Sequence, residues 1–150
     1  MTHRPVLAAV DFSDVTAAVV ETAEQFACCW DAELLLLHVA RPEPDFVGYR
    51  AGPDSAREDV AREVREEHRQ LEKLVRRLSD HELKVTPLLV QGATVEKVLK
   101  MAEDLSAQLI IVGSHGHGAV FHLLVGSVSE GVLRGANCPV VIVPARGLKP

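Results

Sequence analysis

A glycine-rich stretch carries the most chemistry in this sequence. It runs Gly113-Ser114-His115-Gly116-His117-Gly118, directly after a short apolar run, and Gly126-Ser127 follows just before a helical pattern. Closely spaced glycines let the backbone turn its N–H groups toward an anion, and the start of a helix adds free N–H donors and the positive end of its dipole. Ser127 adds a hydroxyl. The pattern therefore indicates a phosphate-binding cradle.

Two common phosphate loops do not fit this stretch. In the G-x-x-x-x-G-K-[ST] loop, Gly113 and Gly118 have the required separation, but Ala119 stands where the lysine should be. The dinucleotide pattern G-x-G-x-x-G should follow the first strand, and residues 11–14 hold no glycine. Neither loop explains the stretch.

Histidines in the same region suggest a metal site as an alternative. His115, His117 and His122 are close in sequence, but a structural zinc ion needs four ligands, and the nearest cysteine, Cys138, falls inside the last apolar run. The sequence also contains no Ser/His/Asp or Cys/His arrangement with a supporting motif. We therefore predict no metal ligands and no catalytic residues.

The elements that must position these residues alternate along the chain. Short apolar runs predict strands, and apolar residues at helical spacing predict helices between them. Residues 41–53, with three prolines and two glycines, indicate a loop. The strands are expected at 6–10, 33–39, 83–90, 109–112 and 139–143, and the helices at 15–30, 54–80, 95–105 and 127–133.

This alternation predicts an α/β fold with an open, doubly wound sheet of parallel strands and helices on both faces. Such sheets bind ligands beyond the carboxyl ends of their strands. Ser13 or Asp14 is expected to cap the first helix and Thr94 the third. His38 is expected to be a hydrogen-bonded core histidine. Cys28 and Cys29 are expected to be small buried side chains.

The spacing Gly113-x2-Gly116-x9-Gly126-Ser127 matches the G-x2-G-x9-G-[ST] motif of the nucleotide-binding universal stress proteins, and the chain resembles that family from residue 4 to residue 144. Further similarity lies at the strand ends, in the segments Val6–Ser13, Leu37–Val39, Gly92, Leu109–Gly116, Gly126–Glu130 and Cys138–Pro144.

The resemblance implies a Rossmann-like fold with strand order 3-2-1-4-5, usually a homodimer, that binds ATP or a related adenine nucleotide. It assigns the ribose hydroxyls to Asp11, adenine to the backbone of Val39, and phosphate to the start of the last helix. The nucleotide-binding residues that we predict are Ala9, Asp11, Val39, Val112, Gly113, Gly116, Gly126, Ser127 and Val128.

One departure from the family leaves open how many phosphates the bound nucleotide carries. Residues 117–125 contain no lysine or arginine, so a triphosphate would rely on backbone donors, Mg²⁺ or the histidines His117 and His122. ATP, ADP and AMP all remain candidates. A stress-response binding and signalling module is the leading hypothesis. The alternatives are a dimeric stress scaffold that binds no nucleotide and a slow nucleotide hydrolase.

Each predicted site residue also has a purely structural interpretation. Asp11 could cap the turn that follows it. Ser127 and Glu130 have the spacing of a capping box, which is compatible with phosphate binding. Gly113 and Gly116 could serve only a tight exit from the strand.

Composition limits the remaining possibilities. The chain has 150 residues, enough for one domain (1–150), with 47% hydrophobic and 25% charged residues. A net charge of -5 argues against a general nucleic-acid or anionic-membrane binder. Three cysteines, without a CxxC pair, favour a reducing compartment, and the first apolar run is too short for a signal peptide or a membrane span.

We therefore expect a soluble, cytoplasmic protein. The last strand is apolar on both faces and lies at the sheet edge in the implied order, which predicts a homodimer through Cys138–Pro144.

Overall fold

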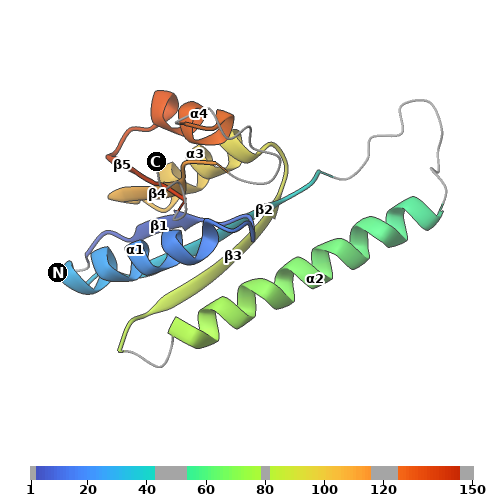
Figure 1. Cartoon of the computed structure of the whole chain (residues 1–150), viewed down its shortest axis with the longest axis horizontal. Coiled ribbons are helices and arrows are strands. Elements are labelled where there is room, and N and C mark those ends of the chain that lie inside the picture. Colours follow the sequence, from blue (N-terminus) through green and yellow to red (C-terminus); the bar gives the residue numbers. More distant parts are fainter. Residues whose placement is uncertain (1–2, 43–53, 79–81, 116–124, 146–150) are drawn as a thin grey trace.

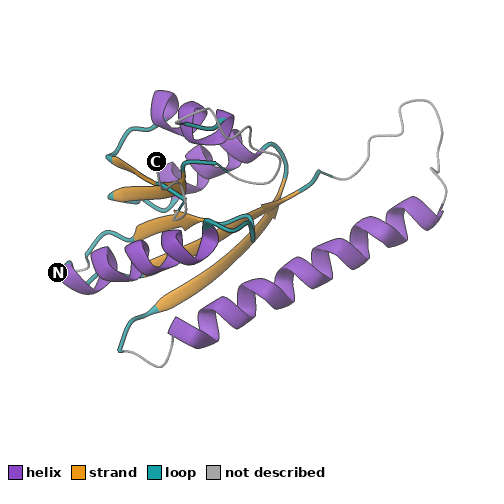
Figure 2. Ribbon diagram, viewed as in Figure 1, coloured by secondary structure: helices purple, strands orange, loops and turns teal. Residues whose placement is uncertain are grey.

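The computed structural model describes residues 3–42, 54–78, 82–115 and 125–145 and contains a five-stranded sheet with the order β3-β2-β1-β4-β5. All neighbouring strands are parallel. The predicted fold class and strand order are confirmed (Figures 1 and 2). The strands are β1 (Val6–Ala9), β2 (Leu34–Ala40), β3 (Val85–Gln91), β4 (Leu109–Gly113) and β5 (Val140–Val143).

The central strands are buried because their apolar runs have no polar face. In β1 and β2, Val6 pairs with Leu34, and on the other side Val6 pairs with Leu109 of β4. Val6, Leu34 and Leu109 are each at most 2% exposed. Burial on both faces is typical of parallel sheets that are covered by helices.

Two of the described helices cover each face of the sheet. Those in the described ranges are α1 (Thr16–Cys29), α2 (Asp54–Leu78), α3 (Thr94–Asp104) and α4 (Ser127–Gly135). Val19 of α1 and Leu71 of α2 pack in one apolar cluster with Ala8. Val98 of α3 and Val132 of α4 pack in another with Leu7. The alternation of neighbouring residues between the two clusters is the period-2 pattern of a strand.

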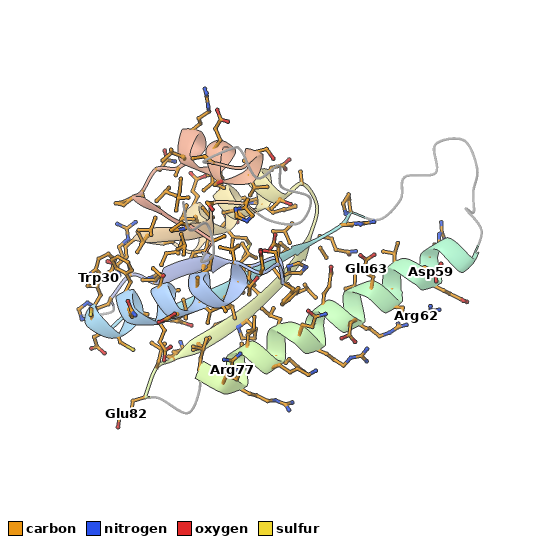
Figure 3. The ribbon with its side chains drawn as sticks, in the orientation of Figure 1. Trp30, Asp59, Arg62, Glu63, Arg77 and Glu82 are labelled. Atoms are coloured by element: carbon orange, nitrogen blue, oxygen red, sulfur yellow. The ribbon has the colours of Figure 1, made fainter. Side chains whose placement is uncertain are left out.

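α2 is anchored by its carboxyl-terminal half. Leu71 and Leu78 are 1% and 4% exposed, whereas the amino-terminal half of the helix projects past the sheet (Figure 1). Asp59 and Arg62 lie on this projecting half (Figure 3), where Arg62 pairs with Asp59 at 3.4 Å. Apolar burial therefore decides where this helix docks.

Several predicted helix caps are wrong. The N-cap of α1 is Val15, with no side-chain hydrogen bond, because Ser13 donates its hydroxyl to Asp11 instead. The N-cap of α3 is Ala93, and Thr94 is already helical. β1 ends at Ala9, one residue earlier than expected.

The expected burial of Cys28 and Cys29 is also wrong, since both thiols are exposed at the end of α1. The helix has already turned its apolar stripe into the core at Ala23 and Ala27, both 0% exposed. Among the residues that the structure describes, no helix is long and apolar enough to cross a membrane.

Candidate functional site

A large pocket lies where the carboxyl ends of the central strands meet. Because β2, β1 and β4 are parallel neighbours, their final residues come together at one edge of the sheet. The pocket has a volume of about 870 Å³, which is within the range of small-molecule sites. Of the predicted residues, it is lined by Ala9, Asp11, Val39, Val112, Gly113, Gly126, Ser127 and Val128.

The remaining predicted residue, Gly116, lies outside the described ranges, as does the loop at 43–53. The fold therefore places the described candidate residues around one pocket. Their roles in binding remain predictions.

Asp11 is held in a tight turn directly after β1. Its Oδ1 accepts hydrogen bonds from the backbone N–H of Ser13, at 3.0 Å, and from the Ser13 hydroxyl, at 2.5 Å. Phe12 between them has φ 61°, a left-handed conformation that bulky residues rarely adopt. The turn thus orients the carboxylate, and the structural interpretation of Asp11 as a turn cap is confirmed.

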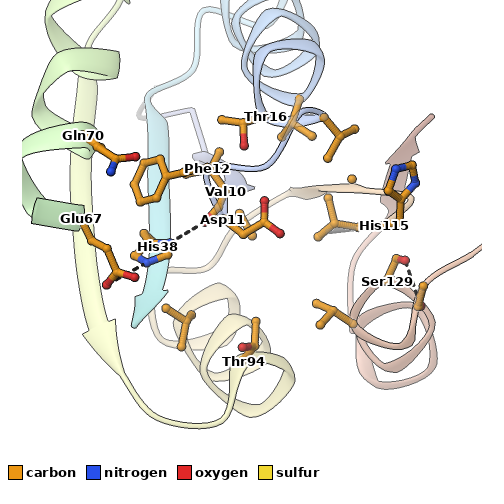
Figure 4. Close-up of a pocket in the computed structure, with 18 of the residues that line it drawn as sticks. Val10, Asp11, Phe12, Thr16, His38, Glu67, Gln70, Thr94, His115 and Ser129 are labelled. Carbon is orange, nitrogen blue, oxygen red and sulfur yellow. Dashed lines mark hydrogen bonds and ion pairs between the residues drawn. The ribbon is translucent and has the colours of Figure 1, made fainter. Parts of the chain in front are cut away.

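The exit from β4 and the start of α4 are tied together. The Gly126 N–H donates to the Ser114 carbonyl at 2.5 Å, and the hydroxyl of Ser129 donates to the same carbonyl at 3.2 Å. Ser129 also donates to the Gly126 carbonyl at 3.1 Å. These bonds hold the first turn of α4 beside Gly113 and Ser114, facing the turn that carries Asp11 (Figure 4).

The predicted capping box at Ser127 and Glu130 is wrong. The N-cap is Gly126, whose backbone is extended and which makes no side-chain cap bond, so Ser127 is the first helical residue. Glu130 instead pairs with Arg134, which donates from Nε at 3.0 Å and from Nη2 at 2.7 Å. The exposed Ser127 side chain lines the pocket and does not cap the helix.

Gly113 is required by close packing between β4 and α1. A Cβ built at Gly113 would lie 2.5 Å from Cγ1 of Val15 and 3.2 Å from the carbonyl oxygen of His115. Gly113 therefore has a structural reason of its own, contact with Val15, which differs from the tight strand exit first considered, and it also lines the pocket.

His38 is a buried core histidine, as predicted. It is 5% exposed, and its Nδ1 lies 2.8 Å from the Val10 carbonyl oxygen. Its Nε2 lies 3.3 Å from Oε2 of Glu67 on α2, and the Phe12 ring packs on the imidazole with 4.6 Å between ring centroids. Figure 4 shows this group at one end of the pocket.

The α2 side of the pocket holds residues that the sequence analysis did not predict as part of the site. The lining there comes from Glu63, Glu66, Glu67 and Gln70, with Arg41 at the end of β2. Arg41 and Glu63 form an ion pair at 3.9 Å, and the Arg69 guanidinium holds the pKa of Glu66 below its usual value. In the sequence, the four lining residues of α2 have the spacing i, i+3, i+4 and i+7, which places them on one face of a helix. This spacing is the signal from which the wall could have been predicted.

Metal binding gains no support from the part of the chain that the structure describes, where no three His, Cys, Asp or Glu side chains gather as ligands. His115 hydrogen-bonds to Ser114, with Nδ1 3.1 Å from the hydroxyl oxygen, and its Nε2 lies 4.0 Å from Oδ1 of Asp14. His117 and His122 lie outside the described residues.

Comparison with known proteins gives a single family. The model of the universal stress protein family matches residues 2–144. Universal stress protein MJ0577 of Methanocaldococcus jannaschii is 29% identical over 153 residues, which cover 94% of each chain. Its solved structure superposes with a TM-score of 0.83 at 28% identity and covers 98% of this chain and 99% of that one.

Two further solved structures share the fold and contain nucleotides. A universal stress protein in complex with cAMP has a TM-score of 0.66 at 22% identity, over 97% of this chain and 99% of that one. A universal stress protein of Archaeoglobus fulgidus in complex with dAMP has a TM-score of 0.69 at 20% identity, over 95% of this chain and 99% of that one. At these identities the likeness concerns the fold.

Proposed function

Because this chain belongs to the universal stress protein family, we propose that it binds an adenine nucleotide in the pocket at the carboxyl edge of its sheet and acts as a binding and signalling module. One observation carries the proposal. The oriented carboxylate of Asp11 and the start of α4 at Gly126 and Ser127 line the same cavity, with Gly113 between them.

The chemistry of the lining residues suits the parts of a nucleotide. A carboxylate accepts hydrogen bonds from two ribose hydroxyls, which is the role proposed for Asp11. The first N–H groups of a helix have no intrahelical acceptor and bind phosphate, the role proposed for Ser127 and Val128. The N–H of Gly126, also predicted to bind phosphate, already donates to the Ser114 carbonyl, so Gly126 would contribute as the N-cap that places the next two donors. The backbone of Val39 would meet adenine, and Ala9 and Val112 would line the base and ribose.

Two proteins of the same fold that hold cAMP and dAMP support this ligand class. We extend the proposal to ATP, with Mg²⁺ on its phosphates. The only lysine or arginine among the described lining residues is Arg41, which is already paired with Glu63. A triphosphate therefore needs Mg²⁺ to offset its charge, whereas AMP does not.

The proposal includes a homodimer through residues 138–144. β5 lies at the edge of the sheet, and Val140, Val141 and Ile142 are only partly buried in the single chain. A second copy of the same strand would cover this edge.

The first test is to denature the purified protein, identify any released nucleotide by chromatography, and titrate the emptied protein with ATP and AMP, with and without Mg²⁺. Asp11→Asn is the key variant because an asparagine still accepts the bonds from Ser13 but lacks the charge. Losing a hydrogen bond to a charged group costs about 1.5–3 kcal/mol, so affinity should fall roughly tenfold to hundredfold.

Asp104→Asn is the matched control, since Asp104 pairs with Lys100 at the end of α3, away from the lining residues. Its affinity should equal that of the natural protein. The absence of both co-purified nucleotide and binding heat at millimolar ligand would refute the proposal and favour a scaffold. Metal-dependent release of phosphate from ATP would identify the hydrolase alternative.

A further inference from the structure

His38 joins three elements at the edge of the pocket. Its neighbours Leu37 and Val39 pack toward α3 and α4, so the His38 ring points to the opposite face of the sheet, between β1 and α2. Its Nδ1 lies 2.8 Å from the carbonyl oxygen of Val10. Because a carbonyl oxygen only accepts, Nδ1 is the donor and carries a proton.

The other ring nitrogen faces a carboxylate. Nε2 of His38 lies 3.3 Å from Oε2 of Glu67, and the two side chains are 6% and 19% exposed. Among the described residues neither atom has a regular hydrogen-bond partner. With Nδ1 already protonated, the contact is attractive when Nε2 also carries a proton, because a neutral ring would turn a lone pair toward the carboxylate. The contact between His38 and Glu67 therefore joins α2 to β2 at the edge of the pocket.

The hydrogen bond from His38 ends on the peptide group just before Asp11, the residue predicted to bind the ribose. The Val10 carbonyl belongs to the peptide group whose nitrogen is that of Asp11. The next residue, Phe12, has the left-handed φ of 61° and packs on the His38 ring. A residue in this conformation persists only when its surroundings hold it. The His38 ring supplies both a hydrogen bond before Asp11 and a packing surface after it.

We propose that Glu67 and His38 are positioning residues for the nucleotide site, and that Glu67 on α2 sets nucleotide affinity by holding the His38 ring against Val10 and Phe12. The inference rests on the proposed function. It also makes α2 a regulatory element, because a ligand that binds better when α2 is docked must in turn stabilise that docking.

The test uses AMP and a matched pair of substitutions on one helix. Glu67→Ala removes the contact to His38. Glu67→Gln keeps a hydrogen-bonding side chain of the same length, because its amide can accept from a protonated Nε2 or donate to a neutral one. The control is Glu72→Ala, which breaks a second His–Glu contact of the same length, His68 Nε2 to Glu72 Oε1 at 3.3 Å, on the exposed side of α2. Each variant is characterised by its calorimetric Kd for AMP and by its unfolding midpoint.

Glu67→Ala is expected to raise the Kd about tenfold, by analogy with the loss of an outer partner of a metal ligand, whereas Glu67→Gln stays within about twofold of the natural protein. Glu72→Ala should leave the Kd unchanged. Hydrogen exchange should show that AMP protects residues 57–78 of α2 in the natural protein and less so in Glu67→Ala. If Glu67→Ala unfolds at the assay temperature, Glu67→Leu, which keeps the volume, replaces it.

Unchanged AMP affinity in Glu67→Ala would overturn the positioning role and leave the proposed function intact. A Kd for Glu67→Gln as high as that for Glu67→Ala would overturn the hydrogen-bond route through His38. If the natural protein binds neither AMP nor ATP, the proposed function and this inference fail together.

Discussion

Two serines in the first turn of α4 have different roles: Ser127 is proposed to contact the nucleotide, and Ser129 stabilises the fold. Ser127 is exposed, lines the pocket and makes no cap bond. Ser129 also borders the pocket, but it is 1% exposed and its hydroxyl is shared between the carbonyls of Ser114 and Gly126. Their positions two residues apart place them on different sides of the helix, since side chains that share a face are three or four apart.

The substitutions Ser127→Ala and Ser129→Ala should therefore change different quantities, the nucleotide affinity in the first and the free energy of unfolding in the second. Ser127→Ala is expected to weaken nucleotide binding and leave the unfolding midpoint unchanged. Ser129→Ala should lower the free energy of unfolding by about 1 kcal/mol, the usual net value of one hydrogen bond. Calorimetric titration and urea denaturation measure the two quantities. Equal loss of stability in both variants would restore the capping role first expected for Ser127.

A steric prediction concerns Gly113. The Cβ of Gly113→Ala would collide with Val15, and forced overpacking of a core costs about 1–3 kcal/mol. Val15→Ala removes the colliding methyl groups, so the double variant should lose less stability than the sum of the two single losses. Urea denaturation of all four proteins gives the coupling. Additive losses would mean that Gly113 is needed for some reason other than contact with Val15.

At the scale of elements, hydrogen bonds from β3 and from the residue just before it hold the Glu33 carboxylate, which precedes β2. Glu33 accepts from the Thr86 hydroxyl at 2.5 Å and from the Lys84 ammonium at 3.0 Å. The bond from Thr86 is the main cause of a pKa of Glu33 below its ordinary value of 4.5. A depressed pKa means that the folded state favours the ionised carboxylate. The resulting stability is present above pH 4.5 and is lost as the pH falls through the folded-state pKa.

Thr86→Val should accordingly destabilise the protein most at neutral pH, and the difference from the natural protein should shrink below pH 4.5. Urea denaturation at a series of pH values between neutrality and acid gives the curve. Thr86→Ser, which keeps the hydroxyl, is the control and should follow the natural protein. A stability difference that does not change with pH would show that the Thr86 hydroxyl does not act through the ionised carboxylate of Glu33.

The elements themselves were largely predictable from the sequence because local patterns determine them. Short continuous apolar runs such as Leu34–Leu37, in alternation with helical patterns, indicate buried strands in a sheet covered on both faces. The strand order followed from the family resemblance. Helix caps were less predictable, because a side chain such as Ser13 has competing acceptors and its choice depends on the turn around Asp11.

Contacts between distant segments could not be predicted from periodicity. Glu67 lies on a charged helix whose pattern resembles any solvated face, and only the docking of α2 through Leu71 and Leu78 brings it to His38. In the same way, Ser129 meets Ser114 only once α4 has folded back on the exit of β4. The site residues on strand ends were foreseeable, whereas their supporting residues depend on tertiary packing.

At the scale of the whole molecule, the two edges of the sheet differ. β3 forms one edge of the sheet and contains the exposed Pro87, which has no N–H to donate. α2 packs against β3 and the neighbouring β2. β5 forms the other edge, where Val140, Val141, Ile142 and Val143 contain no proline and no charge. Proline and charge are the features that discourage another chain from pairing with an edge strand. Of the two sheet edges in the described part of the chain, the β5 edge is therefore the one that we propose for self-association.

Sedimentation equilibrium over a wide concentration range should consequently give twice the chain mass of 16.3 kDa. Val141→Lys should convert the dimer to a monomer, because an edge lysine opposes pairing while its aliphatic stem can still cover the apolar surface beneath. Gln91→Lys places the same charge on the β3 edge and should remain dimeric. If the natural protein stays monomeric at every concentration, the β5 edge is not a dimer interface, and if both lysine variants dissociate, net charge rather than strand pairing governs the association.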